Sequence, residues 1–286
     1  MIYEFFCCMP TRKLFTLFSV VFICSSCFMK HNILVLADEI YARLHFQNDH
    51  KSIAKYYPEG TILSSGISKW ASAGGWRVLE YVRQRGTYST PAMKLGYSLY
   101  PKRLAALRKA VASAASHTYS CAPAPVQYAA LWLFTHDEES AEYMAHTRRI
   151  LAAVAQYCHR KLEDVGVKVC SPTGGFYMFP DFEVLRDSLK QMGIETCHQM
   201  CKHLLDEKGI ALMSGGPAFL RPDDELTVRF CFIDFIGTHA LDESQKLGLN
   251  RPLPDDFVKD YCNSMYLAVN CLTSWVEETK KLIISK

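Results

Sequence analysis

Three short clusters in the sequence combine side-chain types that could do chemistry. The clusters are ADEIY (37–41), SSGISKWASAGGWR (64–77) and TVRFCF (227–232). Asp38 can pair with a cation, Lys69 offers an amine that can act as a nucleophile, and the planar guanidinium of Arg229 matches a carboxylate. Taken singly, each has a simpler explanation: a helix cap, a solvated lysine and an arginine that snorkels to water. Their combination in one chain is what favours a shared site.

Short apolar runs place the first two clusters at the ends of strands. The runs NILVLA (32–37) and TILS (61–64) are continuous and apolar, as in parallel strands covered on both faces. Ligands of parallel α/β sheets collect outside the carboxyl ends of the strands. Asp38, Tyr41 and the turn 65–69 therefore fall where chemistry usually takes place.

The remaining sequence predicts a mixture of helices and short strands. We expect helices over 104–115, from Tyr143 to Gly166, and over 197–208 with Gly209 as the C-cap, and strands over 167–170, 175–179 and 226–233. A long helix that leads into an α+β segment indicates a second, smaller domain from about residue 140 onward.

With these motifs together, the chain resembles the class I and II aminotransferases, the fold-type-I family that depends on pyridoxal 5'-phosphate. The likeness rests on D-E-x-Y, on a serine-containing turn before a lysine, on G-W-R with its arginine eight residues past that lysine, and on a late strand arginine. The segments GGFYMF (174–179) and SGGPAF (214–219) also resemble the family's small domain. The resemblance runs, with interruptions, from residue 31 to about residue 275.

The resemblance implies a cofactor role for five residues. Lys69 would be the catalytic residue and would bond to the cofactor through its amine, while Arg77 and Ser68 would hold the phosphate. Asp38 would pair with the pyridine nitrogen, and Tyr41 would reach the phenolic oxygen. A carboxylate beside the ring nitrogen favours its protonated form, which makes the ring a better acceptor of electrons.

Substrate binding is implied for Arg229, which would clamp the α-carboxylate of an amino acid in two parallel hydrogen bonds.

Gly66 stands where many members of the family have another phosphate-binding serine, and Ser64 or Ser65 is a possible substitute. Lys69, next to Trp70 and close to a cationic arginine, is expected to lose proton affinity and so to become more nucleophilic.

Two features depart from the family pattern. The lysine lies well past the middle of the chain in the family but is residue 69 of 286 here, so we expect the N-terminal half of the large domain to be missing. Deleting residues 79–94 restores the family pattern, and this segment is expected to be an inserted, solvated loop. A sheet that lacks strands would expose an apolar face and an unpaired edge.

Composition and cysteine spacing weigh against other classes of protein. The formal charge of +3 is too small for nucleic-acid binding, and 49% apolar with 21% charged residues is an ordinary globular composition. The twelve cysteines, many in apolar runs, indicate reduced core thiols. Neither a redox site at CSSC (24–27) nor a zinc site at CHQMCKH (197–203) is expected, and no metal is expected elsewhere.

The N-terminal segment is read in two ways. Residues 14–29 carry no charge and follow Arg12 and Lys13, which resembles the apolar region of a signal sequence or a membrane contact. The alternative is a non-native start to a cytoplasmic chain. Residues 1–30 are therefore set apart from a partial cofactor-binding domain, 31–139, and a small C-terminal domain, 140–286.

The expected fold is α/β: the C-terminal part of a large domain with a mostly parallel sheet and helices on both faces, followed by a small α+β domain. The expected activity is transfer of an amino group between an L-amino acid and a 2-oxo acid, with the homodimer typical of the family. Two alternatives stay open, a catalytically incompetent paralogue that binds a full-length relative and a lyase on the same scaffold.

Overall fold

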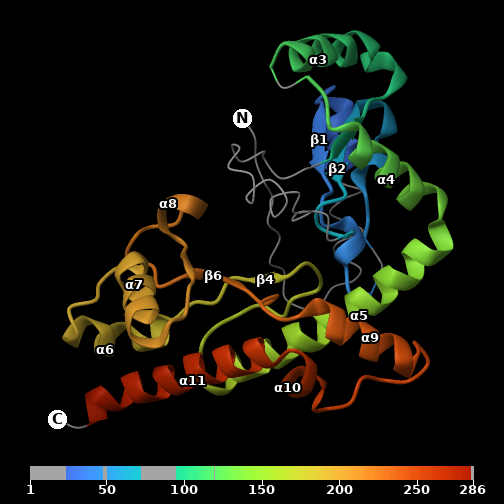
Figure 1. The fold of residues 1–286 in the computed structure, drawn as a ribbon. Helices are drawn as coiled ribbons and strands as arrows, with labels where there is room; N and C mark the ends of the chain where they lie inside the picture. The colour runs from blue at the N-terminus through green and yellow to red at the C-terminus, as the bar shows by residue number, and fades with distance from the viewer. Residues whose placement is uncertain (1–23, 48–49, 72–94, 119, 285–286) are drawn as a thin grey trace, which may run out of the picture. The chain divides into compact units, whose positions relative to one another are not determined.

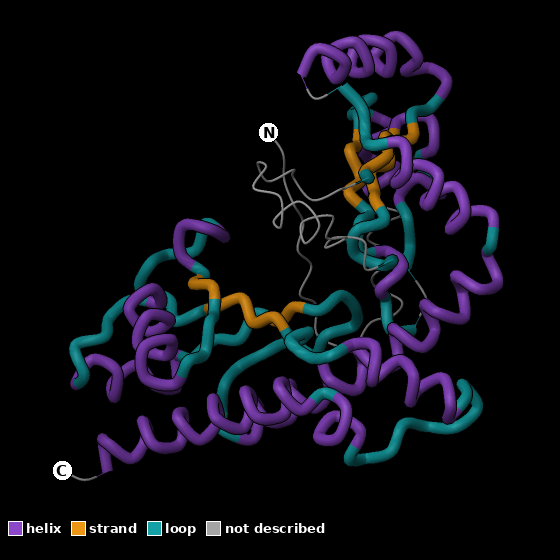
Figure 2. Tube along the Cα trace, in the orientation of Figure 1, coloured by secondary structure: helices purple, strands orange, loops and turns teal. Residues whose placement is uncertain are grey.

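The structure, a computed structural model, describes residues 24–47, 50–71, 95–118 and 120–284. They form two compact units: an N-terminal unit that ends at Ala145 and a C-terminal unit that begins at His146 (Figure 1). Figure 2 shows each unit as a short stretch of sheet accompanied by helices. Over the described part of the chain, none of the helices has the length and apolar character needed to cross a membrane.

The sheet of the N-terminal unit brings two strand ends together. Its strands are β1 (Val35–Asp38), β2 (Thr61–Gly66) and β3 (Gly96–Leu99), in the order β1-β2-β3. β1 and β2 are parallel, with Asp38 opposite Ser64, whereas β3 runs antiparallel to β2, with Gly96 opposite Gly66. The carboxyl ends of β1 and β2 therefore lie at one edge of the sheet, as the apolar runs predict.

The first strand differs from its prediction in length and burial. It begins at Val35 rather than at Asn32, because residues 24–30 are helical and Asn32 ends that turn with a left-handed φ of 51°. The expectation of a strand covered on both faces is wrong for the described residues, since Leu36 is 62% exposed. Burial alternates along β1 because one face packs on the unit and the other is open.

Short helices connect the strands of this unit and longer ones follow them. The 3-10 helices are η1 (Ala42–Leu44), η2 (Ile53–Lys55), η3 (Pro58–Gly60) and η5 (Lys102–Leu104), and the α-helices are α3 (Ala105–Thr118), α4 (Ala124–Thr135) and the start of α5 (Asp137–Asp164). The predicted helix over 104–115 is confirmed as α3, although none of its residues is buried.

Three aromatic side chains contact one another near the turn after β2. Phe134 of α4 meets Tyr97 of β3 edge to face, with ring centroids 5.6 Å apart, and meets Trp70 in the same way at 5.9 Å. Trp70 is only 2% exposed. Such pairs stabilise a core beyond the area they bury, so α4 anchors the turn that carries Trp70.

The C-terminal unit is built on a small antiparallel sheet, β4 (Tyr177–Met178), β6 (Val228–Cys231) and β5 (Met213–Ser214), in the order β4-β6-β5. The strands expected over 175–179 and 226–233 are confirmed in shorter form. The strand expected over 167–170 is wrong, since this segment makes a single bridge, between Lys168 and Asp181. Asp181 also bridges to Thr227, so it links this segment to the residue before β6.

Several helices accompany this small sheet, and α7 (Cys197–Lys208) contacts β5. They are the rest of α5, η6 (Glu183–Leu185), α6 (Arg186–Gln191), α7 (Cys197–Lys208), α8 (Gly216–Phe219), α9 (Gly237–Leu247), α10 (Phe257–Tyr261) and α11 (Asn263–Ile284). The helix predicted over 197–208 is confirmed with the same bounds. Thr196 and Gln199 form a capping box at its start, and Gly209 ends it with a φ of 67°.

The cysteines of α7 belong to the core. Cys197 and Cys201 are buried, and burial raises the pKa of the Cys201 thiol to about 12, with the nearby Cys197 adding to the shift. A thiol with so high a pKa carries little thiolate at neutral pH, so it is a poor nucleophile.

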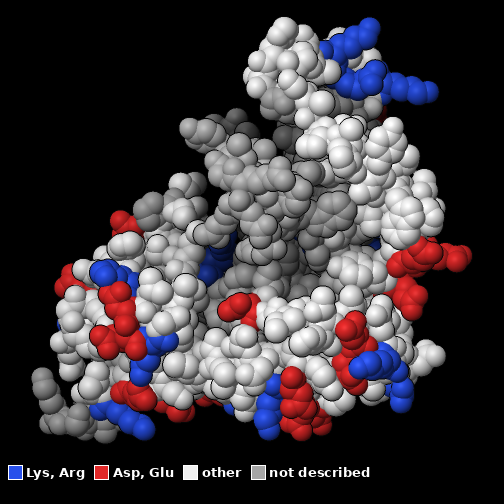
Figure 3. Space-filling view, viewed as in Figure 1, with Lys and Arg blue, Asp and Glu red and all other residues white. Residues whose placement is uncertain are grey.

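The surface charges of the C-terminal unit alternate in sign. Figure 3 shows Lys and Arg side chains beside Asp and Glu over this unit. Among its ion pairs, Lys202 lies 2.6 Å from Asp206. Interleaved charges of this kind produce no strong field of one sign on the face shown.

Candidate functional site

The two parallel strand ends carry the first part of the candidate site. Asp38 is the last residue of β1, and Lys69 follows the end of β2 by three residues, inside a single turn closed by a 3.0 Å hydrogen bond from Ala71 N–H to Ile67 O. One Asp38 carboxylate oxygen accepts a 3.2 Å hydrogen bond from the Ile40 N–H. The carboxylate is exposed and oriented by its own turn, which leaves its other oxygen for a ligand.

Glu39 fastens this edge to the loop that precedes β2. Its carboxylate accepts a 2.5 Å hydrogen bond from the Ser52 hydroxyl and lies 3.2 Å from the His50 Nε2. Burial raises the pKa of Glu39, but the contacts with His50 and Ser52 outweigh it and hold the pKa below the ordinary value of 4.5. Glu39 is therefore ionised at neutral pH and braces the strand end.

Lys69 and Tyr41 lie close to each other. The Lys69 Nζ is 5.7 Å from the centroid of the Tyr41 ring, and both side chains are half-buried. Tyr41 precedes η1 directly, so the strand end, the short helix and the turn after β2 together position the amine and the phenol.

Trp70, the residue after Lys69, makes a cation–π contact with Arg43 that the sequence did not predict. The Arg43 guanidinium lies 4.2 Å from the centroid of the Trp70 ring, a cation–π contact beneath the turn. The two residues are distant in the sequence, and neither carries a local signal of this contact.

The structure explains why position 66 is a glycine rather than the serine common in the family. A Cβ at Gly66 would lie 2.7 Å from the Leu95 carbonyl oxygen and 3.1 Å from the Ile40 Cδ1. Any larger residue would push β3 away from β2, so the backbone pairing itself excludes a serine here.

The serines that could bind the phosphate differ in whether their hydroxyl groups already have hydrogen-bond partners. Ser64 Oγ accepts a 3.4 Å hydrogen bond from Ser98, and Ser65 Oγ donates one of 3.2 Å to the Glu39 carbonyl, so each has a protein partner. Ser68 makes no hydrogen bond to the described residues through its hydroxyl. Arg77 and the segment 79–94 lie outside the described residues.

Arg229 lies in the C-terminal unit, in the middle of β6. Its flanking residues Val228 and Phe230 are buried, so the guanidinium is on the other face of the strand. The Nε atom is buried without a hydrogen-bond partner, and no described carboxylate pairs with the side chain. A guanidinium without a counter-charge is able to bind an external anion.

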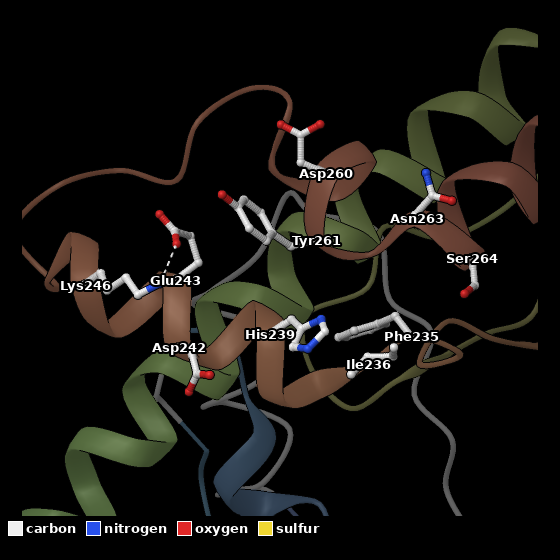
Figure 4. Close-up of a pocket in the computed structure, with 10 residues that line it drawn as sticks. All are labelled: Phe235, Ile236, His239, Asp242, Glu243, Lys246, Asp260, Tyr261, Asn263 and Ser264. Carbon is white, nitrogen blue, oxygen red and sulfur yellow. Dashed lines mark hydrogen bonds and ion pairs between the residues drawn. The ribbon is translucent and has the colours of Figure 1, made fainter.

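The C-terminal unit also has a surface pocket of about 390 Å³ that includes none of the predicted site residues. Figure 4 shows side chains from α9 on one side and from α10 and the start of α11 on the other. Its only lysine, Lys246, lies 3.4 Å from Glu243, and their contact is drawn as a dashed line.

Comparison with known protein families gives one match over most of the chain. The family model described as aminotransferase class I and II matches residues 23–234. The probable N-acetyl-LL-diaminopimelate aminotransferase of Bacillus subtilis is 32% identical over 184 residues, which are 64% of this chain and 39% of that protein. An aspartate aminotransferase of Geobacillus stearothermophilus is 29% identical over 220 residues, 75% of this chain and 49% of its own. The chain thus spans less than half the length of these curated relatives.

Solved structures share the fold. The aspartate aminotransferase from Thermus thermophilus with maleate has a TM-score of 0.60 at 21% identity, and covers 81% of this chain with 52% of its own. The N-succinyldiaminopimelate aminotransferase from Mycobacterium tuberculosis gives 0.58 at 22% identity, over 80% of this chain and 52% of its own. At such identities the likeness concerns the fold, and it confirms the predicted α/β fold of type I.

Proposed function

Because the chain belongs to the aminotransferase class I and II family, we propose that it serves amino-group transfer between an L-amino acid and a 2-oxo acid, with pyridoxal 5'-phosphate as cofactor. The observation that carries this proposal is the edge where two parallel strands end, with Asp38, Tyr41 and Lys69 on adjacent segments. A carboxylate, a phenol and an amine at this edge are the groups that such a cofactor needs.

The residues present fit that cofactor. Lys69 would hold it through the amine, Asp38 would pair with its ring nitrogen, Tyr41 would donate to its phenolic oxygen, and the Ser68 hydroxyl, which has no partner among the described residues, would bind its phosphate together with Arg77. When bound, pyridoxal phosphate supplies an electron sink that stabilises negative charge on the Cα of an amino acid.

The protein's own groups then have distinct tasks. The Lys69 amine would serve as the base that takes a proton from the substrate Cα and as the acid that gives the proton back. Glu39 keeps Asp38 and Tyr41 in place by bracing the strand end against the loop at Ser52. Arg229 orients the substrate by its α-carboxylate, and a lysine could not reproduce the two parallel hydrogen bonds.

Borohydride reduction tests the cofactor site directly. The 286-residue chain is mixed with pyridoxal 5'-phosphate, reduced and digested, and the modified lysines are identified by mass spectrometry. We expect Lys69 to be labelled in preference to the exposed Lys55 and Lys102, since a positioned amine forms the Schiff base more efficiently. The Lys69→Arg variant is the control. Equal labelling of all three lysines would refute the assignment.

A homodimer is the second part of the proposal. The exposed apolar residues of the N-terminal unit, such as Leu36 at 62% and Leu131 at 59%, support a contact with another protein surface. Light scattering on the purified chain distinguishes the dimer from a monomer. The alternative of a catalytically incompetent paralogue predicts that the chain binds a full-length relative instead.

Analysis of the reaction products separates amino-group transfer from a lyase reaction.

A further inference from the structure

We propose that Tyr177 and Phe219 are positioning residues that hold the Arg229 guanidinium between two aromatic rings and present it to a carboxylate ligand. This inference rests on the proposed function of Arg229. It adds two residues that orient the arginine, for which no acidic partner is present among the residues that the structure describes.

The register of the small sheet places Tyr177 and Arg229 on the same face. Tyr177 is opposite Cys231, and Arg229 is two residues before Cys231 on β6, so the pair is a diagonal neighbour across the antiparallel ladder. Diagonal neighbours are within reach of aromatic and long side chains. Met178 and Phe230, one residue along, are buried on the opposite face.

The ring contacts follow this arrangement. The Arg229 Cζ lies 4.7 Å from the centroid of the Tyr177 ring and 5.8 Å from that of Phe219. Both distances are within the range of cation–π attraction, and the shorter one makes Tyr177 the stronger contact. Two rings limit the rotamers of a long, flexible side chain that would otherwise move freely.

Phe219 owes its position to a close approach of the loop before α8. A Cβ at Gly215 would lie 2.2 Å from the Thr227 Oγ1 and 2.8 Å from the Thr227 carbonyl oxygen, so only glycine lets the loop come this near to β6. Phe219 then packs edge to face on Phe179, with centroids 5.4 Å apart. The Phe179 ring thus limits where the Phe219 ring can lie.

The hydrogen-bonding state of the arginine points to an external partner. A structural arginine on a sheet usually pairs with a carboxylate or with carbonyl oxygens. Arg229 has no such partner in the described residues, and its Nε is buried and unsatisfied. Because the Nε edge is closed to solvent, the two Nη atoms form the edge on which a carboxylate can bind in a bidentate manner.

Titration calorimetry of the 286-residue chain with maleate, a dicarboxylate, tests the inference without any need for turnover. We expect the dissociation constant of Tyr177→Leu to be about tenfold higher than that of the wild type, which is about 1.4 kcal/mol, and that of Phe219→Leu to be about threefold higher. Tyr177→Phe keeps the ring face and is expected to bind within about twofold of the wild type.

Each outcome separates the two proposals. If Arg229→Met binds maleate as well as the wild type, or if the wild type does not bind maleate, Arg229 does not bind the carboxylate. The positioning role of Tyr177 and Phe219 is then refuted as well. If Arg229→Met loses binding while both leucine variants keep wild-type affinity, the aromatic rings have no positioning role. Circular dichroism confirms that each variant is folded, and Phe219→Leu decides the matter if Tyr177→Leu does not fold.

Discussion

Gly66 and Gly96 face each other across β2 and β3, yet replacing them by alanine is expected to have opposite effects on stability. Neither glycine has a positive φ, so backbone strain does not distinguish them. The two positions differ in the free space around the Cα, which decides whether a Cβ can be accommodated.

The expected magnitudes follow from that space. A Cβ at Gly66 would lie 2.7 Å from the Leu95 carbonyl oxygen, which is itself bonded to the Ile67 N–H and cannot move without loss of that bond. Overpacking of this kind costs about 1–3 kcal/mol, and the lower entropy of the unfolded chain offsets about 0.4–1 kcal/mol. At Gly96 the nearest atom, the Ser65 carbonyl oxygen, is 3.6 Å away, an ordinary contact. Gly66→Ala should lose about 1–2 kcal/mol and Gly96→Ala gain up to about 1 kcal/mol.

Urea unfolding followed by tryptophan fluorescence measures both changes, and hydrogen exchange of peptides from β2 and β3 locates them. Peptides from α7, in the other unit, are the internal reference. The reasoning is refuted if the two variants have the same free energy of unfolding, or if Gly66→Ala is the more stable of the two.

Two further predictions concern stability. Leu220 has a φ of 55° and is 94% exposed, so Leu220→Gly should raise the free energy of unfolding by about 1 kcal/mol, while Leu220→Ala, still left-handed, should not. The lowered pKa of Glu39 means that its stabilisation is present above about pH 4.5 and is lost as the pH falls through the folded-state value. The stability difference between the wild type and Glu39→Gln should therefore shrink on acidification in urea titrations, and a constant difference would contradict this.

Local signals account for the parts of the fold that the sequence predicted well. The bounds of α7 follow from Thr196, Gln199 and Gly209, which lie within a few residues of the helix ends they define. The alternation in TVRFCF likewise separates Arg229 from the buried Val228 and Phe230. Both inferences need only the periodicity of a single element.

Long-range contacts account for what the sequence could not predict. The cation–π contact of Arg43 with Trp70 joins a residue of η1 to a residue of the turn after β2, 27 positions later, and no periodicity in the sequence links the two. The contact of Tyr177 with Arg229 depends on strand register, which no single segment specifies. The exposure of Leu36 depends on what covers β1, and an apolar run alone does not reveal that.

The contacts of Trp70 with Arg43 and Phe134 also have an optical consequence. An indole held rigidly next to Lys69 emits in the range in which a pyridine aldehyde bound to that lysine absorbs. Excitation energy would pass from Trp70 to the bound molecule, and the indole emission would fall as the site fills. The chain thus carries, one residue from its candidate catalytic amine, a fluorophore that reports occupancy without any label.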